Sequence, residues 1–453
     1  MPMPSVEVLT VPAGGRHLVW APLRGVAFVA NGAMLSLIGR MVGGEPPDDP
    51  SPATREAITF LDATGILEPT SPPCEMGSVA RYLPSCATLF MTTRCSLRCT
   101  YCYADAGATS VREMSPDLAR RAIDVVARNA AALGRPGFAV GFHGGGEPTL
   151  NMVTMRAAVE HARAKPLPAQ ISASSNGAWS PALRRFVLGN LDTLSLSFDC
   201  LPALQDAQRP FADGRGSHAL VMRNIEAMDA AGFEYGIRMT VTRESMGLLP
   251  DAVTYIVEHA KPRTLQVEPA FPRGRGRGKE LGSGDAAAFV SAFEEAWRIA
   301  DAHGVRLLYS GARIGQPTAR FCQATTDALV VMQSGEVTCC FEVHGPEHPL
   351  AADLVFGRLD ERGLHVDEAR WRSLASRTAE ARADCQECLC RYHCQGDCIG
   401  RALEVSERDG SVPSVRCEIN RRVTAFLLLK GIERMGGVWV AAAEGRSPNG
   451  RAS

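Results

Sequence analysis

The chain has 453 residues, enough for two or three domains around a large buried core. Hydrophobic residues make up 45% of it and charged residues 21%, which excludes a wholly disordered chain. Because Lys+Arg 48 nearly balances Asp+Glu 49, no strong overall field favours nucleic acid or an anionic membrane as a partner. The first ten residues lack the charged start and apolar run of a signal peptide, and no uninterrupted apolar run reaches about 18 residues. The sequence therefore predicts a cytoplasmic protein without nucleic-acid or membrane partners.

Residues 1–85 form the first predicted region, a small N-terminal domain with its linker. We expect a strand at 17–21, a helix-like stretch at 27–41 and a helix at 52–64 that ends at Gly65. Prolines between the two helices separate them. The Pro- and Ser-containing stretch 68–78 is typical of a linker.

Residues 86–305 alternate strands with helices. Apolar, β-rich runs lie at 86–92, 138–143, 170–175, 193–199, 235–242 and 265–270. Helical patterns lie between them, for example 115–134, with Ser115 as the N-cap and Gly134 as the stop. Six such repeats predict parallel strands with right-handed crossovers, hence an α/β barrel or open sheet. In either architecture the chemistry belongs at the C-terminal ends of the strands.

Residues 306–442 form a third region of short strands, cysteine-rich loops and a helix near 416–435, and a disordered tail is expected at 443–453. The chain has 15 cysteines, and an odd number without a secretion signal favours metal, cluster or redox chemistry over disulfides. Ten of them form an early and a late group: Cys95, Cys99 and Cys102, then Cys322, Cys340, Cys385, Cys388, Cys394, Cys398 and Cys417. The remainder are expected mainly as small buried side chains: Cys74, Cys86, Cys200, Cys339 and Cys390.

The early cysteines lie in one loop, directly after the first predicted strand. Three thiolates can ligate three irons of a [4Fe–4S] cube and leave the fourth iron open to a cofactor or substrate. A zinc site is the alternative, but structural zinc normally takes four protein ligands. The nearest further donor, His143, is one strand away.

This CxxxCxxC pattern, with Tyr101 before its last cysteine, resembles the signature of the radical S-adenosylmethionine (SAM) enzymes. Three later loops, each after a predicted strand, also resemble that family: Gly144-Gly145-Gly146-Glu147-Pro148, Ser175-Asn176-Gly177 and Ser197-Phe198-Asp199. Arg209 follows where related enzymes have a carboxylate-binding arginine. The resemblance covers residues 86–304.

The resemblance implies a (β/α)6 partial TIM-type barrel in which the early cysteines hold a [4Fe–4S] cluster that binds SAM. It implies SAM contacts from Gly145, Gly146, Glu147, Pro148, Ser175, Asn176, Ser197 and Arg209. Reductive cleavage of SAM would give a 5′-deoxyadenosyl radical that abstracts an unactivated hydrogen. The cofactors carry that chemistry, and the protein positions the substrate and excludes side reactions.

The late cysteines resemble the seven-cysteine SPASM domain, which holds two auxiliary [4Fe–4S] clusters. By that resemblance the ligands interleave: Cys322, Cys340 and Cys398 serve the first auxiliary cluster, and Cys385, Cys388, Cys394 and Cys417 the second. A zinc ribbon is the alternative. The usual cysteine before Cys322 is absent. Cys339, Cys390 or a non-cysteine donor could complete the first auxiliary cluster, or its fourth iron is open.

Residues 16–68 resemble the PqqD-like winged-helix domain, which binds the leader of a precursor peptide by adding it as a strand. The alternative is a scaffolding extension that packs on the barrel. SPASM enzymes commonly modify peptides or proteins, so the predicted partners are a precursor peptide and a reductant such as flavodoxin or ferredoxin. The expected function is radical modification of a ribosomally made peptide.

Several reactions remain open: a thioether, carbon–carbon or carbon–oxygen crosslink, an epimerisation or a dehydrogenation. Cys339 and Cys390 are nominal hydrogen donors for an epimerase. Formylglycine formation is disfavoured because Phe341, where those maturases have aspartate, follows Cys340. A small-molecule or protein substrate and a non-catalytic iron–sulfur electron carrier are the rivals. The arginine-rich stretch 272–279 is expected to be a solvated loop, with contact to an acidic peptide as the alternative.

Overall fold

The structure is a computed structural model that describes residues 6–45, 50–70, 81–108, 110–376, 383–401 and 414–441. Most of the predicted linker, 71–78, and the predicted tail, 443–453, lie outside the described residues.

Six parallel strands form the centre of the molecule, and they are the six that the sequence predicts. In spatial order they are β4 (Cys86–Phe90), β5 (Phe138–His143), β6 (Ala169–Ser175), β7 (Thr193–Ser197), β8 (Tyr235–Val241) and β9 (Thr264–Pro269). Each neighbouring pair is parallel. The predicted α/β fold of the partial TIM-barrel type is confirmed.

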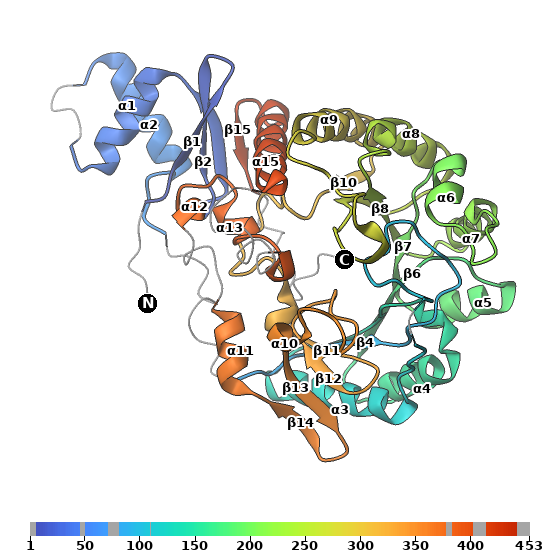
Figure 1. The fold of residues 1–453 in the computed structure, drawn as a ribbon. Coiled ribbons are helices and arrows are strands. Elements are labelled where there is room, and N and C mark those ends of the chain that lie inside the picture. The colour runs from blue at the N-terminus through green and yellow to red at the C-terminus, as the bar shows by residue number, and fades with distance from the viewer. Residues whose placement is uncertain are drawn as a thin grey trace.

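Helices connect these strands and cover the outside of the curved sheet (Figure 1). They are α3 (Pro116–Ala132), α4 (Met152–Arg163), α5 (Pro181–Asn190), α6 (Pro202–Gln208), α7 (His218–Ala230), α8 (Leu249–His259) and α9 (Ala286–Ala302). Ser115 caps α3 as predicted, accepting a hydrogen bond from the backbone N–H of Leu118 at 3.2 Å.

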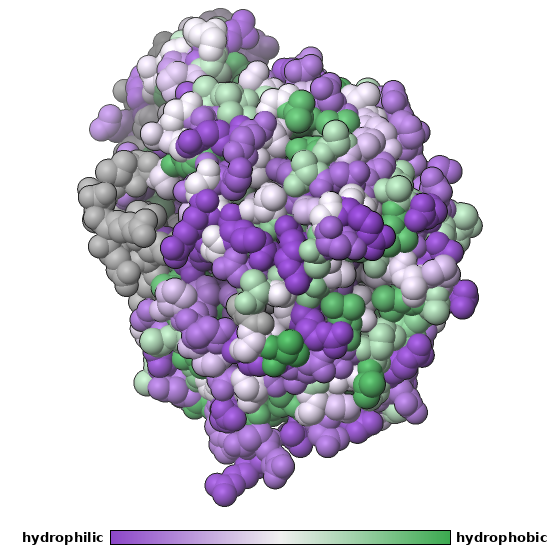
Figure 2. Space-filling view, turned by 45° about the vertical axis from the view of Figure 1, so that its right-hand side comes forward, coloured by the Kyte–Doolittle hydropathy of each residue, from purple (hydrophilic) through white to green (hydrophobic). Residues whose placement is uncertain are grey.

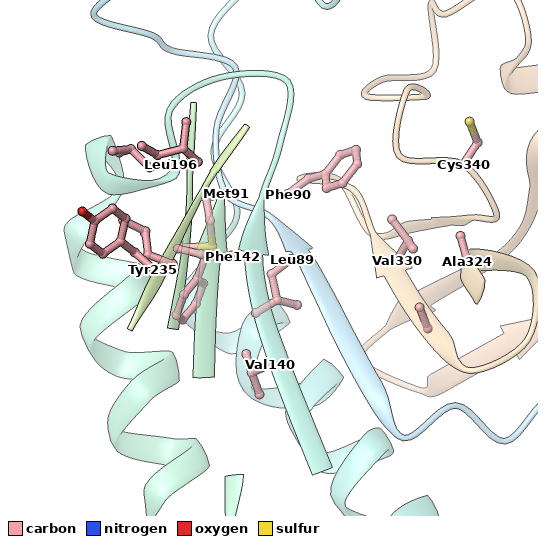
Figure 3. Packing of buried hydrophobic residues seen from close by; sticks show 14 of the residues in the cluster. Leu89, Phe90, Met91, Val140, Phe142, Leu196, Tyr235, Ala324, Val330 and Cys340 are labelled. Atoms are coloured by element: carbon pink, nitrogen blue, oxygen red, sulfur yellow. The ribbon is translucent and has the colours of Figure 1, made fainter. Parts of the chain in front are cut away.

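Alternation along the strands separates the hydrophobic core from the interior of the barrel. On β5, Phe138, Val140 and Phe142 are buried in the core that the helices share, whereas Gly141 and His143 face the other way and are half-buried. Figure 3 shows Phe90 pointing to the side of the sheet on which Cys340 lies, with Tyr235 on the opposite side.

The C-terminal region extends the barrel sheet at both edges. β10 (Arg306–Leu308) pairs with β9, and β11 (Ala328–Val331) pairs with β4, both in parallel. The antiparallel strands β12 (Glu336–Thr338), β13 (Val355–Asp360) and β14 (Gly363–Val366) follow. The helices of this region are α10 (Ala351–Leu354), α11 (Glu368–Ala375), α12 (Ala383–Gln386), α13 (Arg391–Cys394) and α15 (Val415–Arg434). The predicted helix near 416–435 is confirmed by α15.

The described residues of the N-terminal region form three strands and two helices: β1 (Leu9–Ala13), β2 (Arg16–Ala21), β3 (Val26–Ala30), α1 (Gly32–Val42) and α2 (Pro52–Thr64). The expected helix-like stretch 27–41 is wrong at its start, because residues 27–30 belong to β3. This run is rich in strand-forming side chains and pairs with β2 and with the C-terminal strand β15 (Val438–Val440). The helix begins only after Asn31, which caps it.

The N-terminal sheet lies between two layers. One face packs on α1 and α2 through Phe28 and Leu61, and the other packs on the C-terminal region through Leu18 and Trp20. The rings of Trp20 and Trp439 are 5.4 Å apart. The N-terminal region is therefore attached to the cysteine-rich region (Figure 1, upper left).

None of the helices among the described residues is both long and apolar enough to cross a membrane. Figure 2 shows hydrophilic and hydrophobic residues interspersed over one face of the molecule.

Candidate active site

The loop after β4 carries Cys95, Cys99 and Cys102 as free thiols. Burial raises the pKa of Cys95 to about 12 and that of Cys99 to about 11, and each pKa is raised further by the neighbouring thiols. Two cations oppose this effect at Cys99. The Nη1 of Arg209 lies 3.9 Å from its Sγ, and the Nε of Arg275 donates to its carbonyl at 2.8 Å. Positive charge is therefore available beside Cys99.

The glycine-rich loop after β5 is seated directly on this cysteine loop. The N–H of Gly146 donates to the carbonyl of Thr92 at 3.0 Å, and the N–H of Glu147 donates to the carbonyl of Arg94 at 2.7 Å. A Cβ at Gly146 would lie 2.1 Å from the carbonyl oxygen of Arg94. Glycine is therefore required by the close approach of two backbones.

Glu147 joins the loop after β5 to the loop after β6. Its buried carboxylate accepts hydrogen bonds from Thr149 Oγ1 at 2.6 Å, Ser175 Oγ at 2.7 Å and the Asn176 N–H at 2.8 Å. Burial raises the pKa of Glu147, and these hydrogen bonds oppose the rise. The Nδ2 of Asn176 lies 3.8 Å from the Sγ of Cys95. The predicted loops therefore meet around the thiols.

Asp199, after β7, is the centre of a buried network that the sequence analysis missed. Its carboxylate accepts from Tyr101 Oη at 2.6 Å, Gln208 Nε2 at 3.0 Å and Arg209 Nε at 3.1 Å. Tyr101 belongs to the cysteine loop, so Asp199 fixes both that loop and the predicted SAM-binding arginine. Its position in the sequence could have indicated this role, because Asp199 ends the Ser197-Phe198-Asp199 motif directly after a predicted strand.

Inside the barrel, Ser197 on β7 is in register with Arg238 on β8. Arg238 is exposed although it lies within a strand, and no ion pair or side-chain hydrogen bond links its guanidinium to another described residue. Burial, with the charge of Arg238, lowers the pKa of His143 to about 4. Two strands separate β5 from β8, so this influence acts across the interior of the barrel. Arg238 was also missed by the sequence analysis.

The first group of late thiols is brought together by loops. A Cβ at Gly400 would lie 3.4 Å from the Sγ of Cys340 and 3.8 Å from that of Cys398. A hydrogen bond between these two thiols lowers the pKa of Cys398. Cys322 is close enough for Cys398 to raise its pKa, although burial is the larger cause.

The second group of late thiols comes from α12, the loop after it, α13 and the start of α15. Asn420 Nδ2 donates to the Sγ of Cys394 at 3.4 Å, and burial and the nearby Cys417 raise the pKa of Cys394. Cys388 interacts with Cys390, and the carbonyl of Cys385 accepts from the N–H of Cys388 at 3.3 Å. The structure thus places Cys394 near Cys417, and it links Cys385 to Cys388 through the backbone.

The stretch 272–279 is not the solvated loop that the sequence suggested. Arg273 is buried, and its guanidinium contacts Glu342 Oε2 at 3.3 Å, His348 Nε2 at 2.9 Å and the carbonyl of Gly400 at 3.3 Å. Arg275 binds the early cysteine loop, as described above. A Cβ at Gly274 would lie 2.5 Å from the carbonyl of Cys102. These residues therefore link the early cysteines to the first group of late thiols.

Residues 89–256 match the family model described as the Radical SAM superfamily. This match assigns a radical SAM domain to residues 89–256. The Serine-type anaerobic sulfatase-maturating enzyme of Klebsiella pneumoniae is 26% identical over 326 residues, which are 67% of this chain and 78% of that protein. The Mycofactocin maturase MftC of Mycolicibacterium smegmatis is 27% identical over 195 residues, which are 43% of this chain and 46% of that protein.

Solved structures share the fold of the radical SAM domain and of much that surrounds it. The structure of anSMEcpe with bound AdoMet has a TM-score of 0.60 at 18% identity and covers 78% of this chain and 96% of that chain. SuiB of Streptococcus suis, bound to S-adenosylmethionine, has a TM-score of 0.53 at 12% identity, and the match covers 91% of this chain and 98% of that chain. With the matched domain, the relatives indicate a radical SAM enzyme of the SPASM maturase type that uses SAM and a [4Fe–4S] cluster.

The residues present fit these cofactors. Three thiols on one loop, with Arg209 beside Cys99, suit the cluster, and the glycine-rich loop leaves its backbone close to this loop. These candidate residues lie at the C-terminal ends of β4 to β7, the end at which a parallel α/β barrel binds its ligands.

Proposed function

We propose that this radical SAM enzyme modifies a ribosomally made peptide by hydrogen abstraction, forming a crosslink or an oxidised residue. One observation carries the proposal: the loops after β4, β5, β6 and β7 gather around three free thiols, and two further thiol groups follow in the C-terminal region. SAM and its [4Fe–4S] cluster, when bound, supply the 5′-deoxyadenosyl radical that takes the hydrogen.

The chain's own residues hold and orient these groups. Cys95, Cys99 and Cys102 would hold the cluster. The backbone of residues 145–148 would bind the amino end of SAM, with Ser175 and Asn176 beside it, and Ser197 would contact SAM further along the barrel. Arg209 would bind the SAM carboxylate, and the hydrogen bond from its Nε to Asp199 fixes the direction of its remaining donors.

The late thiols would hold two auxiliary [4Fe–4S] clusters. Cys322, Cys340 and Cys398 are assigned to the first, and Cys385, Cys388, Cys394 and Cys417 to the second. A crosslink or an oxidation removes two electrons from the substrate. One electron would leave with the abstracted hydrogen atom, and an auxiliary cluster would accept the other. A flavodoxin- or ferredoxin-type reductant in the cytoplasm would supply the separate electron that cleaves SAM.

The N-terminal region supports a peptide as the substrate. Among the described strands, β1 pairs only with β2, so one of its edges is open. A groove of about 280 Å³ lies between residues 6–10 and α1, and its lining is mainly apolar, including Val8, Leu35 and Val42. An open strand edge beside an apolar groove suits a peptide that adds as a strand.

The test is accurate mass measurement on short peptides encoded beside this gene, after anaerobic co-expression with the enzyme. The proposal is supported if a peptide loses two hydrogens with the native enzyme but keeps them with Cys99→Ala. An unchanged mass with deuterium gained in heavy water indicates epimerisation instead. No change in any peptide favours a small-molecule or protein substrate. An electron carrier would form no 5′-deoxyadenosine from SAM.

Oxidation of a serine in a sulfatase is a second candidate, favoured by the similarity to the Klebsiella pneumoniae enzyme. Phe341 after Cys340 disfavours it. Incubation with a serine-containing sulfatase peptide tests it, because formylglycine formation removes two hydrogens from that serine.

A further inference from the structure

The first group of late thiols provides three sulfur donors, Cys322, Cys340 and Cys398, where a fully ligated [4Fe–4S] cluster needs four protein ligands. Two spare cysteines, Cys339 and Cys390, are near these ligands in the sequence, so the fold decides whether either can be the fourth ligand. The following inference rests on the cluster assignment made under the proposed function.

Both spare cysteines lie elsewhere. Cys339 is buried beside Tyr82, where it and Cys86 contribute to raising the pKa of the tyrosine, after burial as the largest cause. Cys390 belongs to the second group, with its Sγ 3.4 Å from Thr424 Oγ1 and in contact with Cys388.

Glu342 lies at the first group. A Cβ at Gly400 would be 3.9 Å from its Oε2, 3.4 Å from the Sγ of Cys340 and 3.8 Å from the Sγ of Cys398. A carboxylate oxygen and two thiols therefore surround one point. With a side chain only 9% exposed, Glu342 is a buried acid beside two of the three thiols.

Arg273 holds this carboxylate in place. Its Nε is 3.3 Å from Oε2, while Nη1 and Nη2 bind His348 and the carbonyl of Gly400. The guanidinium thus fixes the 340–348 loop against the loop that carries Cys398. The carboxylate oxygen that Arg273 contacts, Oε2, is also the one that lies near the thiols of Cys340 and Cys398.

We propose that Glu342 is the fourth ligand of the first auxiliary [4Fe–4S] cluster and that Arg273 positions its carboxylate. Three thiolates and one carboxylate oxygen complete the cluster. It then has no iron open to a substrate thiolate or amide, so it serves electron transfer alone.

The test uses the full chain, reconstituted anaerobically, with its glutamate labelled with ¹³C at the side-chain carboxyl. Electron–nuclear double resonance on the reduced protein detects a ¹³C nucleus whose carboxylate binds a paramagnetic cluster. We expect this coupling in the native chain and its loss in Glu342→Gln. Glu342→Cys should keep the cluster's iron and change its electron paramagnetic resonance g values. Glu347→Gln is the matched control, because that carboxylate is on the same loop but pairs with Arg112.

A native chain without ¹³C coupling overturns the proposal, whatever the variants do. So does an unchanged coupling in Glu342→Gln. Loss of peptide modification in that variant, with the g values and coupling intact, would show that Glu342 acts on the substrate instead. The cluster assignment fails separately if Cys340→Ala keeps all of the iron.

Discussion

The barrel and the cysteine-rich C-terminal region hold their chemical groups in different ways. In the barrel, each site loop follows a strand, and strand register alone brings Ser197 opposite Arg238. In the C-terminal region the thiols come from loops and short helices, and buried charges connect them. Arg416 there binds Glu268 of β9 at 3.4 Å and Asp397 at 2.8 Å.

This difference means that the barrel site should tolerate loss of a ligand, whereas the C-terminal region should not tolerate loss of a buried charge. Backbone hydrogen bonds and apolar packing keep the barrel folded without its cofactors. A buried arginine that is removed leaves two carboxylates uncompensated. The predictions below test this contrast.

The largest effect is expected for Cys99→Ala. Removing one of three cluster ligands should reduce 5′-deoxyadenosine formation from SAM to the background level, measured by liquid chromatography and mass spectrometry. The midpoint of unfolding should change little, because the Cys99 side chain is small and only half-buried. Cys200→Ala, at a buried cysteine away from the thiol groups, is the control and should retain SAM cleavage. Equal loss in both variants would contradict the assignment.

Arg416→Met should destabilise the protein by about 3–5 kcal/mol, because it leaves Glu268 and Asp397 buried without their cation. Denaturant unfolding measures this. Glu268→Gln in the same chain should recover part of the loss. If Arg416→Met has the same midpoint denaturant concentration of unfolding as the native chain, the C-terminal region does not depend on this ion pair.

The same contrast explains what the sequence could predict. The six strands were found because alternating apolar residues and helix caps are local signals, and the loops after them could then be placed together. Arg273 and Arg275 could not be assigned, because their partners Glu342 and Cys99 are distant in the chain. The start of α1 was misjudged because the pairing of β3 with β15 is equally non-local.

Gly146→Ala tests whether the barrel site depends on close backbone approach. Its new Cβ would meet the carbonyl of Arg94, so the glycine-rich loop must move away from the cysteine loop. We expect SAM to bind about 10- to 100-fold more weakly, as a small displacement of binding groups costs this much. Equilibrium binding under anaerobic conditions measures it. Gly189→Ala, in open space on α5, is the matched control and should bind SAM normally. Normal SAM binding by Gly146→Ala would contradict the proposed role of this loop.

The smallest effect concerns His143 and the interior of the barrel. Burial and Arg238 hold its pKa at about 4, against an ordinary value of 6.5. Between these values the unfolded chain binds a proton that the folded chain does not, so this histidine makes stability fall as pH decreases from about 6.5 to about 4, by at most about 1.4 kcal/mol per pH unit. His143→Gln should flatten that part of the curve of unfolding free energy against pH. Arg238→Gln should flatten it partly, by removing the smaller cause, whereas the exposed Arg128→Gln on α3 should not. An identical pH dependence in the native chain and in His143→Gln would show that this histidine carries its charge as easily in the barrel as in water, and that Arg238 does not act across the interior.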